Sequence, residues 1–273
     1  MHHLFSVLKI KFNFAKMDQI IGKHIIRLQK VNSTNNYANS KLKVNELQDG
    51  SVFLAYEQSN GRGQMYNFWE SEPGKNLTFS IVVFPYFLDI RRQFMLSKVV
   101  TLGIYMALFK YVDDLRIKWP NDIYVGNKKL GGILIENSIM NSSIKSSVIG
   151  IGININQTVF LSNAPNPVSM KTLTNQHFDC ELVLSEILSG IDFYYSLLKN
   201  GEEELIDKEF ISVLYQLNEK HWFLAEQEIF EGEIIGVNEI GQLLIRKENG
   251  EILNFHFKEV EFLHRPGHGS LND

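Results

Sequence analysis

Residues 115–136 read LRIKWPNDIYVGNKKLGGILIE, and this stretch decides the fold class. Leu115–Trp119 and Ile123–Val125 are strand-like runs on either side of a Pro-Asn turn, and a third run, Leu130–Glu136, follows Gly126-Asn127. A short glycine and asparagine segment between apolar runs is typical of a hairpin. The stretch therefore predicts consecutive strands that are joined by tight turns.

The sequence on both sides of this stretch adds further strands and helices. Strand patterns cover residues 52–56, 76–84 and 147–156, and helical spacing of apolar residues covers residues 34–44, 94–111, 182–198 and 202–217. Ser33 stands at the N-cap position of the first helix. Strands that are joined by hairpins and packed with helices favour an α+β fold with a mixed β-sheet flanked by helices.

The last part of the chain changes character and predicts a second domain. Residues 228–237, 241–247 and 251–257 read as three short strands with turns at 238–241 and 249–250. A module of this size suits a small C-terminal β-barrel. We therefore divide the chain into an N-terminal extension at 1–17, a larger domain at 18–222, and a barrel with its tail at 223–273.

Composition and charge exclude several classes of protein. The 273 residues are 44% hydrophobic and 21% charged, which is ordinary for a globular protein. The net charge of −4 argues against a general nucleic-acid binder, and no apolar run is long enough to predict a membrane span. The single cysteine, Cys180, fits a reducing compartment, so we expect a cytoplasmic protein. Met17 is an alternative start to Met1.

A glycine-rich loop with the sequence EQSNGRGQ, Glu57–Gln64, follows the strand at 52–56. Glycine allows the backbone to approach a ligand closely, and arginine between two glycines suits a phosphate or a carboxylate. Glutamine side chains both donate and accept hydrogen bonds, so they suit a neutral polar group such as a urea. Taken alone, a Gly-Arg-Gly turn is more often a solvated loop.

Five motifs of this kind occur in order along the chain. They are Ser33-Thr34-Asn35, the loop Gln58–Gln64, Lys118-Trp119-Pro120-Asn121-Asp122, Lys129–Leu134 with its glycine pair, and Gly150-Ile151-Gly152-Ile153-Asn154. Each has a structural interpretation on its own, as a helix cap, a turn, a solvated lysine or a tightly packed strand. Together they place cations beside glycines at strand ends, and Lys118 with Asp122 suits a phosphate and a Mg²⁺ ion.

At these five motifs the chain resembles the biotin protein ligases, over most of residues 18–263. The resemblance implies a catalytic domain similar to that of class II synthetases and an SH3-like C-terminal barrel. It also implies an ATP-dependent ligase that forms a carbon–nitrogen bond. Biotin would react with ATP to give biotinyl-5′-AMP, and a lysine of a biotin carboxyl carrier domain would then take the biotin. ATP and biotin would be substrates, with Mg²⁺ as cofactor.

The resemblance also assigns roles to residues. It implies that biotin is bound by Ser33, Thr34, Asn35, Gln58, Arg62, Gly63, Gln64, Lys129, Gly131 and Gly132. It implies that the nucleotide is bound by Arg62, Gly63, Gln64, Trp69, Asn76, Lys118 and Asn154. Arg62, Lys118, Asp122 and Lys129 would be catalytic, and Asp122 would be the candidate metal ligand.

The chain departs from the family pattern in two places. Many relatives have a second Arg-Gly pair in the loop, where this chain has Met65 and Tyr66, so the roles of Met65–Phe68 stay open. Some relatives also carry an N-terminal DNA-binding domain, for which about thirty residues before Ser33 are too few. We therefore expect a monofunctional ligase, as a monomer or homodimer, without nucleic acid or membrane as partner.

Two other interpretations remain open from the sequence. One is a lipoate or octanoate ligase or transferase of the same broad fold, and the other is a non-catalytic biotin-binding module. The presence of Lys118, Asp122 and Lys129 favours an enzyme over the binding module.

Overall fold

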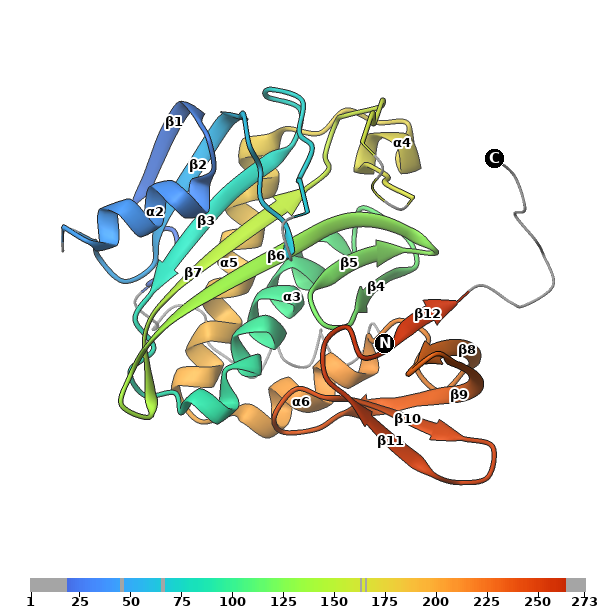
Figure 1. Cartoon of the computed structure of the whole chain (residues 1–273). Coiled ribbons are helices and arrows are strands. Elements are labelled where there is room, and N and C mark those ends of the chain that lie inside the picture. The colour runs from blue at the N-terminus through green and yellow to red at the C-terminus, as the bar shows by residue number, and fades with distance from the viewer. Residues whose placement is uncertain (1–18, 45–46, 65–66, 163, 165, 264–273) are drawn as a thin grey trace.

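Our computed structural model describes residues 19–44, 47–64, 67–162, 164 and 166–263, and its frame is a mixed seven-stranded sheet (Figure 1). The expected extension at residues 1–17 lies outside the described residues. The strands are β1 Ile25–Val31, β2 Ser51–Gln58, β3 Leu77–Val83, β4 Leu115–Lys118, β5 Asp122–Val125, β6 Lys128–Met140 and β7 Ser143–Ile153. Their spatial order is β1-β2-β3-β7-β6-β5-β4, with β1 and β2 parallel and every other pair antiparallel.

Helices cover both faces of this sheet. They are α2 Thr34–Leu42, the 3₁₀ turn η3 Ile90–Arg92, α3 Phe94–Leu108, α4 Met170–Thr174, α5 Cys180–Lys199 and α6 Glu203–Ser212. Helices α3 and α5 lie against one face and α2 lies against the other (Figure 1). The α+β fold with a mixed sheet flanked by helices, expected from the sequence, is therefore confirmed.

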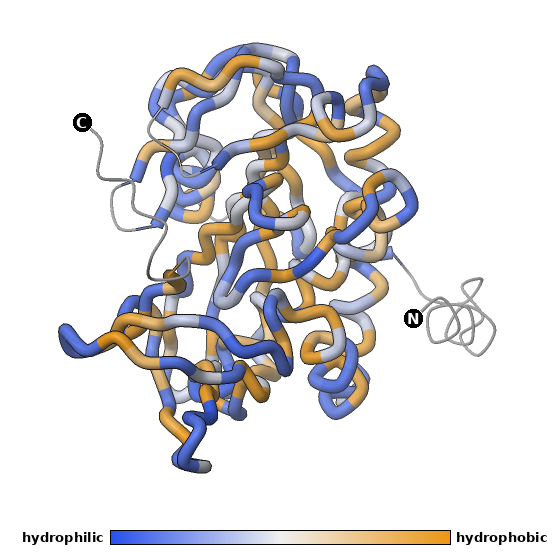
Figure 2. Tube along the Cα trace, turned by 90° about the vertical axis from the view of Figure 1, so that its right-hand side faces the viewer, coloured by the Kyte–Doolittle hydropathy of each residue, from blue (hydrophilic) through white to orange (hydrophobic). Residues whose placement is uncertain are grey.

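The two faces of the sheet have different cores. Hydrophobic positions gather in the interior, along the central strands and the helices behind them (Figure 2). The larger core lies on the α3 and α5 side and contains Ile149, Ile151 and Ile153 of β7. Since side chains alternate along a strand, Gly150 and Gly152 of β7 point to the opposite, α2 side. That side therefore has room for a ligand at the middle of the sheet.

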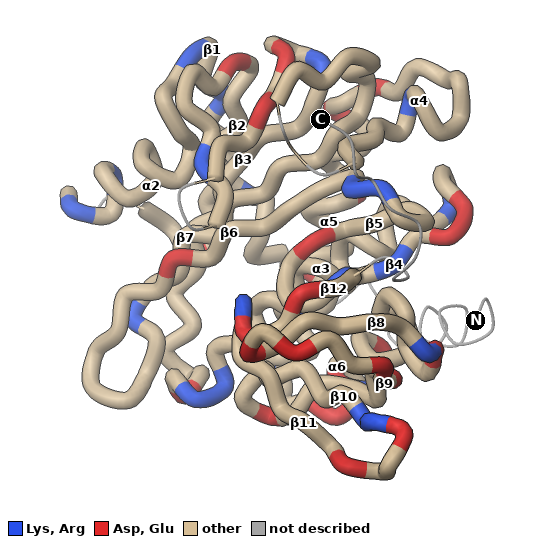
Figure 3. Tube along the Cα trace, turned by 45° about the vertical axis from the view of Figure 1, so that its right-hand side comes forward, with Lys and Arg blue, Asp and Glu red and all other residues tan. Residues whose placement is uncertain are grey.

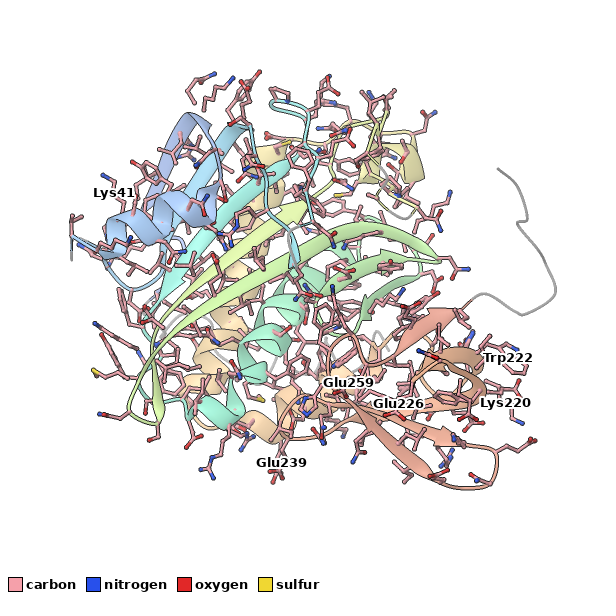
Figure 4. All side chains as sticks on the ribbon, viewed as in Figure 1. Lys41, Lys220, Trp222, Glu226, Glu239 and Glu259 are labelled. Carbon is pink, nitrogen blue, oxygen red and sulfur yellow. The ribbon has the colours of Figure 1, made fainter. Side chains whose placement is uncertain are left out.

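The C-terminal part forms a five-stranded antiparallel sheet. Its strands are β8 Lys220–Ala225, β9 Glu228–Val237, β10 Leu243–Lys247, β11 Ile252–Phe255 and β12 Glu261–Leu263, in the order β11-β10-β9-β8-β12. Lys220 and Trp222 lie at the outer end of this sheet, and Glu259 lies where it approaches the large sheet (Figure 4). Trp119 joins the two parts, because its indole Nε1 donates a hydrogen bond to the Gly241 carbonyl at 2.9 Å.

Some elements differ from the sequence prediction. The helix expected over 202–217 ends at Ser212, and Val213 and Tyr215 instead bond to the Ile117 backbone with N···O distances of 2.9 Å. Strand β4 lies at the edge of the sheet, so its backbone N–H and C=O groups need hydrogen-bond partners from this segment. This requirement comes from the tertiary structure and cannot be read from helical periodicity. Strands β1, β8 and β12 were not predicted, and the domain boundary that we placed between residues 222 and 223 falls inside β8.

The sequence predicted no membrane span, and this prediction concerns the length and hydrophobicity of the helices. Among the described residues, no helix is both long enough and apolar enough to span a membrane.

Candidate active site

A cavity of about 920 Å³ opens on the α2 side of the large sheet, where the C-terminal sheet approaches it. Its walls come from the start of α2, the glycine-rich loop, the β4–β5 turn, strands β6 and β7, the segment after β7, and residues 257–262. Of the residues predicted for the site, it is lined by Ser33, Thr34, Asn35, Gln58, Arg62, Gly63, Gln64, Trp69, Lys118, Asp122, Lys129, Gly132 and Asn154. Ligand sites commonly have this size and concave shape.

The floor of the cavity is made of glycines on neighbouring strands. Gly132 of β6 pairs with Gly152 of β7, and both point to the cavity side. A Cβ atom at Gly152 would collide with the indole of Trp69, and a Cβ atom at Gly150 would collide with the side chain of Asn35. These glycines therefore let two side chains lie directly on the sheet, which is the physical reason for the Gly-x-Gly motif.

The start of α2 forms a polar corner of the cavity. The Thr34 backbone N–H and hydroxyl both donate to Gln58 Oε1, at 2.8 and 3.2 Å. Ser80 Oγ lies 2.7 Å from Thr34 Oγ1 and 2.7 Å from Asn35 Oδ1. Because the oxygen of Gln58 is occupied, its NH₂ group is the end that remains for a ligand.

Ser33 occupies the N-cap position of α2, but its side chain makes no capping hydrogen bond. The residue is almost fully buried and lines the cavity. The N-cap position predicted for Ser33 is therefore confirmed, although its hydroxyl does not bond to the first turn of the helix.

The glycine-rich loop folds back on itself at the entrance. The Gly63 N–H donates to the Asn67 carbonyl at 2.7 Å, and the Trp69 N–H donates to the Gly61 carbonyl at 2.9 Å. The Arg62 guanidinium binds the Asn36 amide oxygen at 2.7 Å and Glu136 Oε1 at 2.8 Å. Met65 and Tyr66, at which the loop departs from the family pattern, lie outside the described residues.

Two lysines lie side by side at the far end of the cavity, in different surroundings. Lys129 Nζ forms an ion pair with Asp122 Oδ1 at 2.7 Å. Lys118 forms no ion pair within the described residues. Burial lowers the pKa of its ammonium group. The negative charge of Asp122 opposes this lowering, and the positive charge of Lys129 adds to it. Asp122 therefore neutralises Lys129, a partner for which the sequence motifs gave no signal.

Three buried side-chain polar atoms of cavity-lining residues have no hydrogen-bond partner within the described part of the chain. They are the indole Nε1 of Trp69, a donor, Oδ1 of Asn154, an acceptor, and Oγ of Ser162. The NH₂ group of Asn154 is fixed by the Val168 carbonyl at 3.1 Å, which turns its oxygen away from that bond. Buried polar atoms are nearly always paired in proteins, so a donor and an acceptor left free in one cavity indicate a polar ligand.

Two predicted residues do not line the cavity. Asn76 is buried, accepts a hydrogen bond from the Ile155 N–H at 3.0 Å, and donates to Gln157 Oε1 at 2.5 Å. The missing Cβ of Gly131 would point at the side chain of Ile153, on the core side of β6. The alternation of the strand separates Gly131 from Gly132, and the sequence motif gives no sign of this.

Sequence reasoning missed two acidic residues that organise the site. Glu136 Oε1 accepts a hydrogen bond from the Arg62 guanidinium, and Glu136 Oε2 accepts one from the Asn35 NH₂ group, at 2.8 Å each. Its place four residues after Gly132 on β6, on the same face, was a usable signal. Glu70 also lines the cavity. Burial by itself raises the pKa of Glu70, but hydrogen bonds from Ser162, Leu161 and Gln157 bring about a net lowering.

The charges around the cavity differ from those of the whole chain. Acidic positions are frequent on α6 and the C-terminal sheet (Figure 3). The cavity itself is lined by Arg62, Lys118, Lys129 and Lys258 on the basic side, and by Glu70, Asp122 and Glu261 on the acidic side. Since Asp122 is already paired with Lys129, this arrangement suits an anionic ligand.

Comparison with known proteins agrees with this geometry. The sequence model of the biotin/lipoate A/B protein ligase family matches residues 27–154. The bifunctional ligase/repressor BirA of Bacillus spizizenii is 33% identical over 153 residues, which is 54% of this chain and 45% of that protein. The human biotin–protein ligase is 26% identical over 223 residues, which is 76% of this chain and 30% of that protein. The chain thus spans less than half the length of these relatives.

A solved structure extends the likeness to nearly the whole chain. The biotin protein ligase from Aquifex aeolicus in complex with biotin and ATP superposes with a TM-score of 0.74 at 27% identity. The superposition covers 89% of this chain and 100% of that one. The five motifs, the cavity and these matches lead to one conclusion: residues 27–154 match the biotin/lipoate A/B protein ligase family, and nearly the whole chain is similar in fold to the Aquifex aeolicus enzyme.

Proposed function

We propose that this protein is a biotin–protein ligase, which activates biotin with ATP to biotinyl-5′-AMP and then transfers biotin to a lysine of a biotin carboxyl carrier domain. The observation that carries the proposal is the cavity itself. It has the volume for both substrates, and it combines a polar corner, a cationic end and a wall with three polar atoms that lack a partner among the described residues.

Biotin is assigned to the polar corner at the start of α2. The Ser33 hydroxyl and the Gln58 NH₂ group are the groups that suit the ureido ring, which presents both donors and an acceptor. Thr34 and Asn35 are engaged with Gln58, Ser80 and Glu136, so their part is to fix the groups around them. Gly132 leaves space for the ring system above the sheet.

The carboxylate of biotin and the phosphates are assigned to the cations. In the first step a carboxylate oxygen attacks the α-phosphorus of ATP, a P–O bond forms, and pyrophosphate leaves with the electron pair. Arg62, with the backbone of Gly63 and Gln64, together with Lys118 and Lys129, would stabilise the negative charge that builds up on phosphate. The catalysis then rests on positioning and electrostatic stabilisation.

The adenylate base is assigned to the wall where Trp69 lies on Gly152. The free donor on Trp69 and the free acceptor on Asn154 suit the edge of a heteroaromatic ring. Asn76 supports this wall from behind through the Ile155 backbone and Gln157, so we assign it a structural part there.

We assign the binding of Mg²⁺ mainly to the phosphates of the nucleotide, with few ligands from the protein. Within the described residues no group of three or more His, Cys, Asp or Glu side chains is arranged to hold a metal ion. Mg²⁺ commonly binds through one or two carboxylates together with substrate phosphates, and Asp122 fits the part of such a single ligand. When bound with ATP, the ion would supply charge neutralisation at the phosphates.

In the second step the carrier lysine attacks the carbonyl carbon of the mixed anhydride. The amide C–N bond forms, AMP leaves, and the lysine loses a proton. Asp122 lies beside Lys129 at the cavity wall, so it is our candidate for orienting the incoming amine.

Exchange of radiolabelled pyrophosphate into ATP tests the proposal. We expect exchange that depends on biotin and is not supported by lipoate or octanoate, and transfer of biotin when a carrier domain is added. Exchange supported by lipoate alone would assign the chain to the lipoate branch of the family. No exchange with either acid, in a folded protein that binds biotin, would favour a binding module.

A further inference from the structure

The ammonium group of Lys118 lies among three aromatic rings. Its Nζ is 4.6 Å from the ring centre of Tyr124, 4.7 Å from that of Phe262 and 5.6 Å from that of Tyr215. These distances are within the range at which a cation is attracted to the face of a ring. We call these three residues the Lys118 cage.

The cage is assembled from distant parts of the chain. Tyr124 is on β5, Tyr215 is on the segment that follows α6, and Phe262 is on β12 of the C-terminal sheet. Lys118 lies opposite Asp122 in the antiparallel register of strands β4 and β5, without forming an ion pair with it. The C-terminal sheet therefore contributes a ring directly to the surroundings of a lysine in the cavity of the larger domain.

Other contacts hold the rings of the cage in place. The Tyr215 hydroxyl donates to Asn127 Oδ1 at 2.6 Å, and its ring centre is 5.5 Å from that of Tyr124. The Phe262 ring packs edge-on against Phe223, which is fully buried, at 5.5 Å between centres. The rings are thus fixed by their own neighbours, as positioning residues must be.

The neighbouring lysine shows what is particular about Lys118. Lys129 has a carboxylate at 2.7 Å, so much of its charge is already compensated. Within the described part of the chain Lys118 has ring faces in place of a carboxylate. An anion that reaches Lys118 therefore meets a cation that forms no ion pair with a carboxylate of the described residues and whose water shell is incomplete.

We propose that Tyr124, Tyr215 and Phe262 are positioning residues that hold the Lys118 ammonium unpaired, poorly hydrated and directed at the phosphates of the nucleotide. The C-terminal sheet then completes the nucleotide site through Phe262. The part of this proposal that concerns ATP rests on the proposed function, whereas the part that concerns the state of Lys118 does not.

Several charged groups face Lys118 and bear on its titration. Asp122 and Lys129 act on it with opposite sign, and Tyr124 and Tyr215 are titratable rings of the cage itself. Lys258 and Glu261 of the C-terminal part line the same cavity. Burial lowers the pKa of Lys118, whereas the ring faces favour its charged form.

Two substitutions remove a ring of the cage and keep an apolar side chain: Phe262→Leu and Tyr124→Leu. Two matched controls complete the set. Tyr124→Phe keeps the ring, and Phe255→Leu removes a buried ring of the same C-terminal sheet, which stacks on Phe230 away from Lys118. The controls separate loss of the cage from general loosening of the module.

The first measurement needs no substrate. Acetic anhydride labels amines only when they are uncharged, so labelling across a pH series, mapped by mass spectrometry, gives the titration of Lys118 beside that of exposed Lys128. In the parent, we expect Lys118 to titrate below the ordinary value of a lysine, because burial lowers its pKa. Loss of a ring should lower its apparent pKa by about half a unit or more, since a cation–π contact favours the charged form. An unchanged pKa, or a raised one, in both ring-loss variants overturns the proposal.

The second measurement is the biotin-dependent exchange reaction. We expect ring loss to raise the KM for ATP by about 2- to 30-fold, the range that corresponds to one cation–π contact, and to leave the KM for biotin unchanged. Tyr124→Phe and Phe255→Leu should keep the parental value for ATP. A parent that shows no exchange would contradict the proposed function, and the labelling result would still decide whether the cage controls Lys118.

Discussion

The indole of Trp69 lies on β7 at Gly152, in the position that the Cβ atom of any other residue would occupy. The contact fixes one wall of the cavity and leaves the indole Nε1 without a protein partner in the described part of the chain. The site therefore needs a glycine at position 152, because only a residue without a Cβ atom leaves room for the Trp69 indole.

Replacing this glycine should disturb the nucleotide wall. We expect Gly152→Ala to push the Trp69 indole off the sheet, to raise the KM for ATP, and to destabilise the protein by about 1–3 kcal/mol, as overpacking commonly does. Exchange kinetics and urea unfolding check these expectations. If the clash with Trp69 is the cause, combining Gly152→Ala with Trp69→Phe should recover stability relative to the sum of the single variants. Parental behaviour of Gly152→Ala alone would contradict the steric argument.

Removing the paired lysine should impair adenylation. We expect Lys129→Ala to lower the rate of biotin-dependent exchange by about two orders of magnitude, the scale for one charge-stabilising group. The loss also leaves the Asp122 carboxylate without its partner at the phosphates. Lys128→Ala is the matched control, because Lys128 is the exposed neighbour on the same strand. A folded Lys129→Ala variant with the parental rate would refute the assignment.

Binding of substrates should protect the glycine-rich loop. The Arg62 side chain is 39% exposed and is held by Asn36 and Glu136 in the structure. We expect biotin plus ATP to slow tryptic cleavage after Arg62, because the loop then orders over the adenylate and excludes water. Cleavage after Lys199, the exposed last residue of α5, should not change. Equal cleavage after Arg62 with and without ligands, mapped by mass spectrometry, would exclude closure of the loop.

The buried carboxyl of Glu209 should make stability depend on pH. Glu209 accepts a hydrogen bond from the Tyr194 hydroxyl at 2.6 Å, and burial raises its pKa, partly offset by that bond. A carboxyl with a raised pKa in the folded state stabilises the fold while it is protonated, and this contribution is lost as pH rises through the folded value. We expect the melting temperature of Glu209→Gln, relative to that of the parent, to be higher at about pH 8 than at about pH 5.

The control for this prediction is Glu204→Gln, an exposed position on the same helix. It should follow the parent at both pH values, because neither the charged nor the neutral side chain is buried there. Melting temperatures of the three proteins at the two pH values are the measurement. A Glu209→Gln variant whose stability parallels that of the parent would show that Glu209 titrates in the same way in the folded and unfolded states.

Much of the fold was predictable because the signals are local. The turn at Gly126-Asn127 and the apolar runs beside it predicted the β5–β6 hairpin, and the spacing of apolar residues predicted α3 and α5. Strand β12 was missed because three residues carry too little pattern, and it is held in place by pairing with Trp222–Leu224 of β8. The end of α6 was missed because it depends on a hydrogen-bonding demand of β4.

The sequence by itself determined which residue types the site contains and which family the chain resembles. Gly-x-Gly, Gly-Arg-Gly and Lys-Trp-Pro-Asn-Asp are local patterns, because backbone approach and turn formation are local requirements. Tertiary structure alone decided the partners: Asp122 with Lys129, Arg62 with Glu136, and Lys118 with the ring of Phe262. Charge and ring contacts act over a few ångströms in space, and the folding of the sheets brings together residues that no sequence spacing relates.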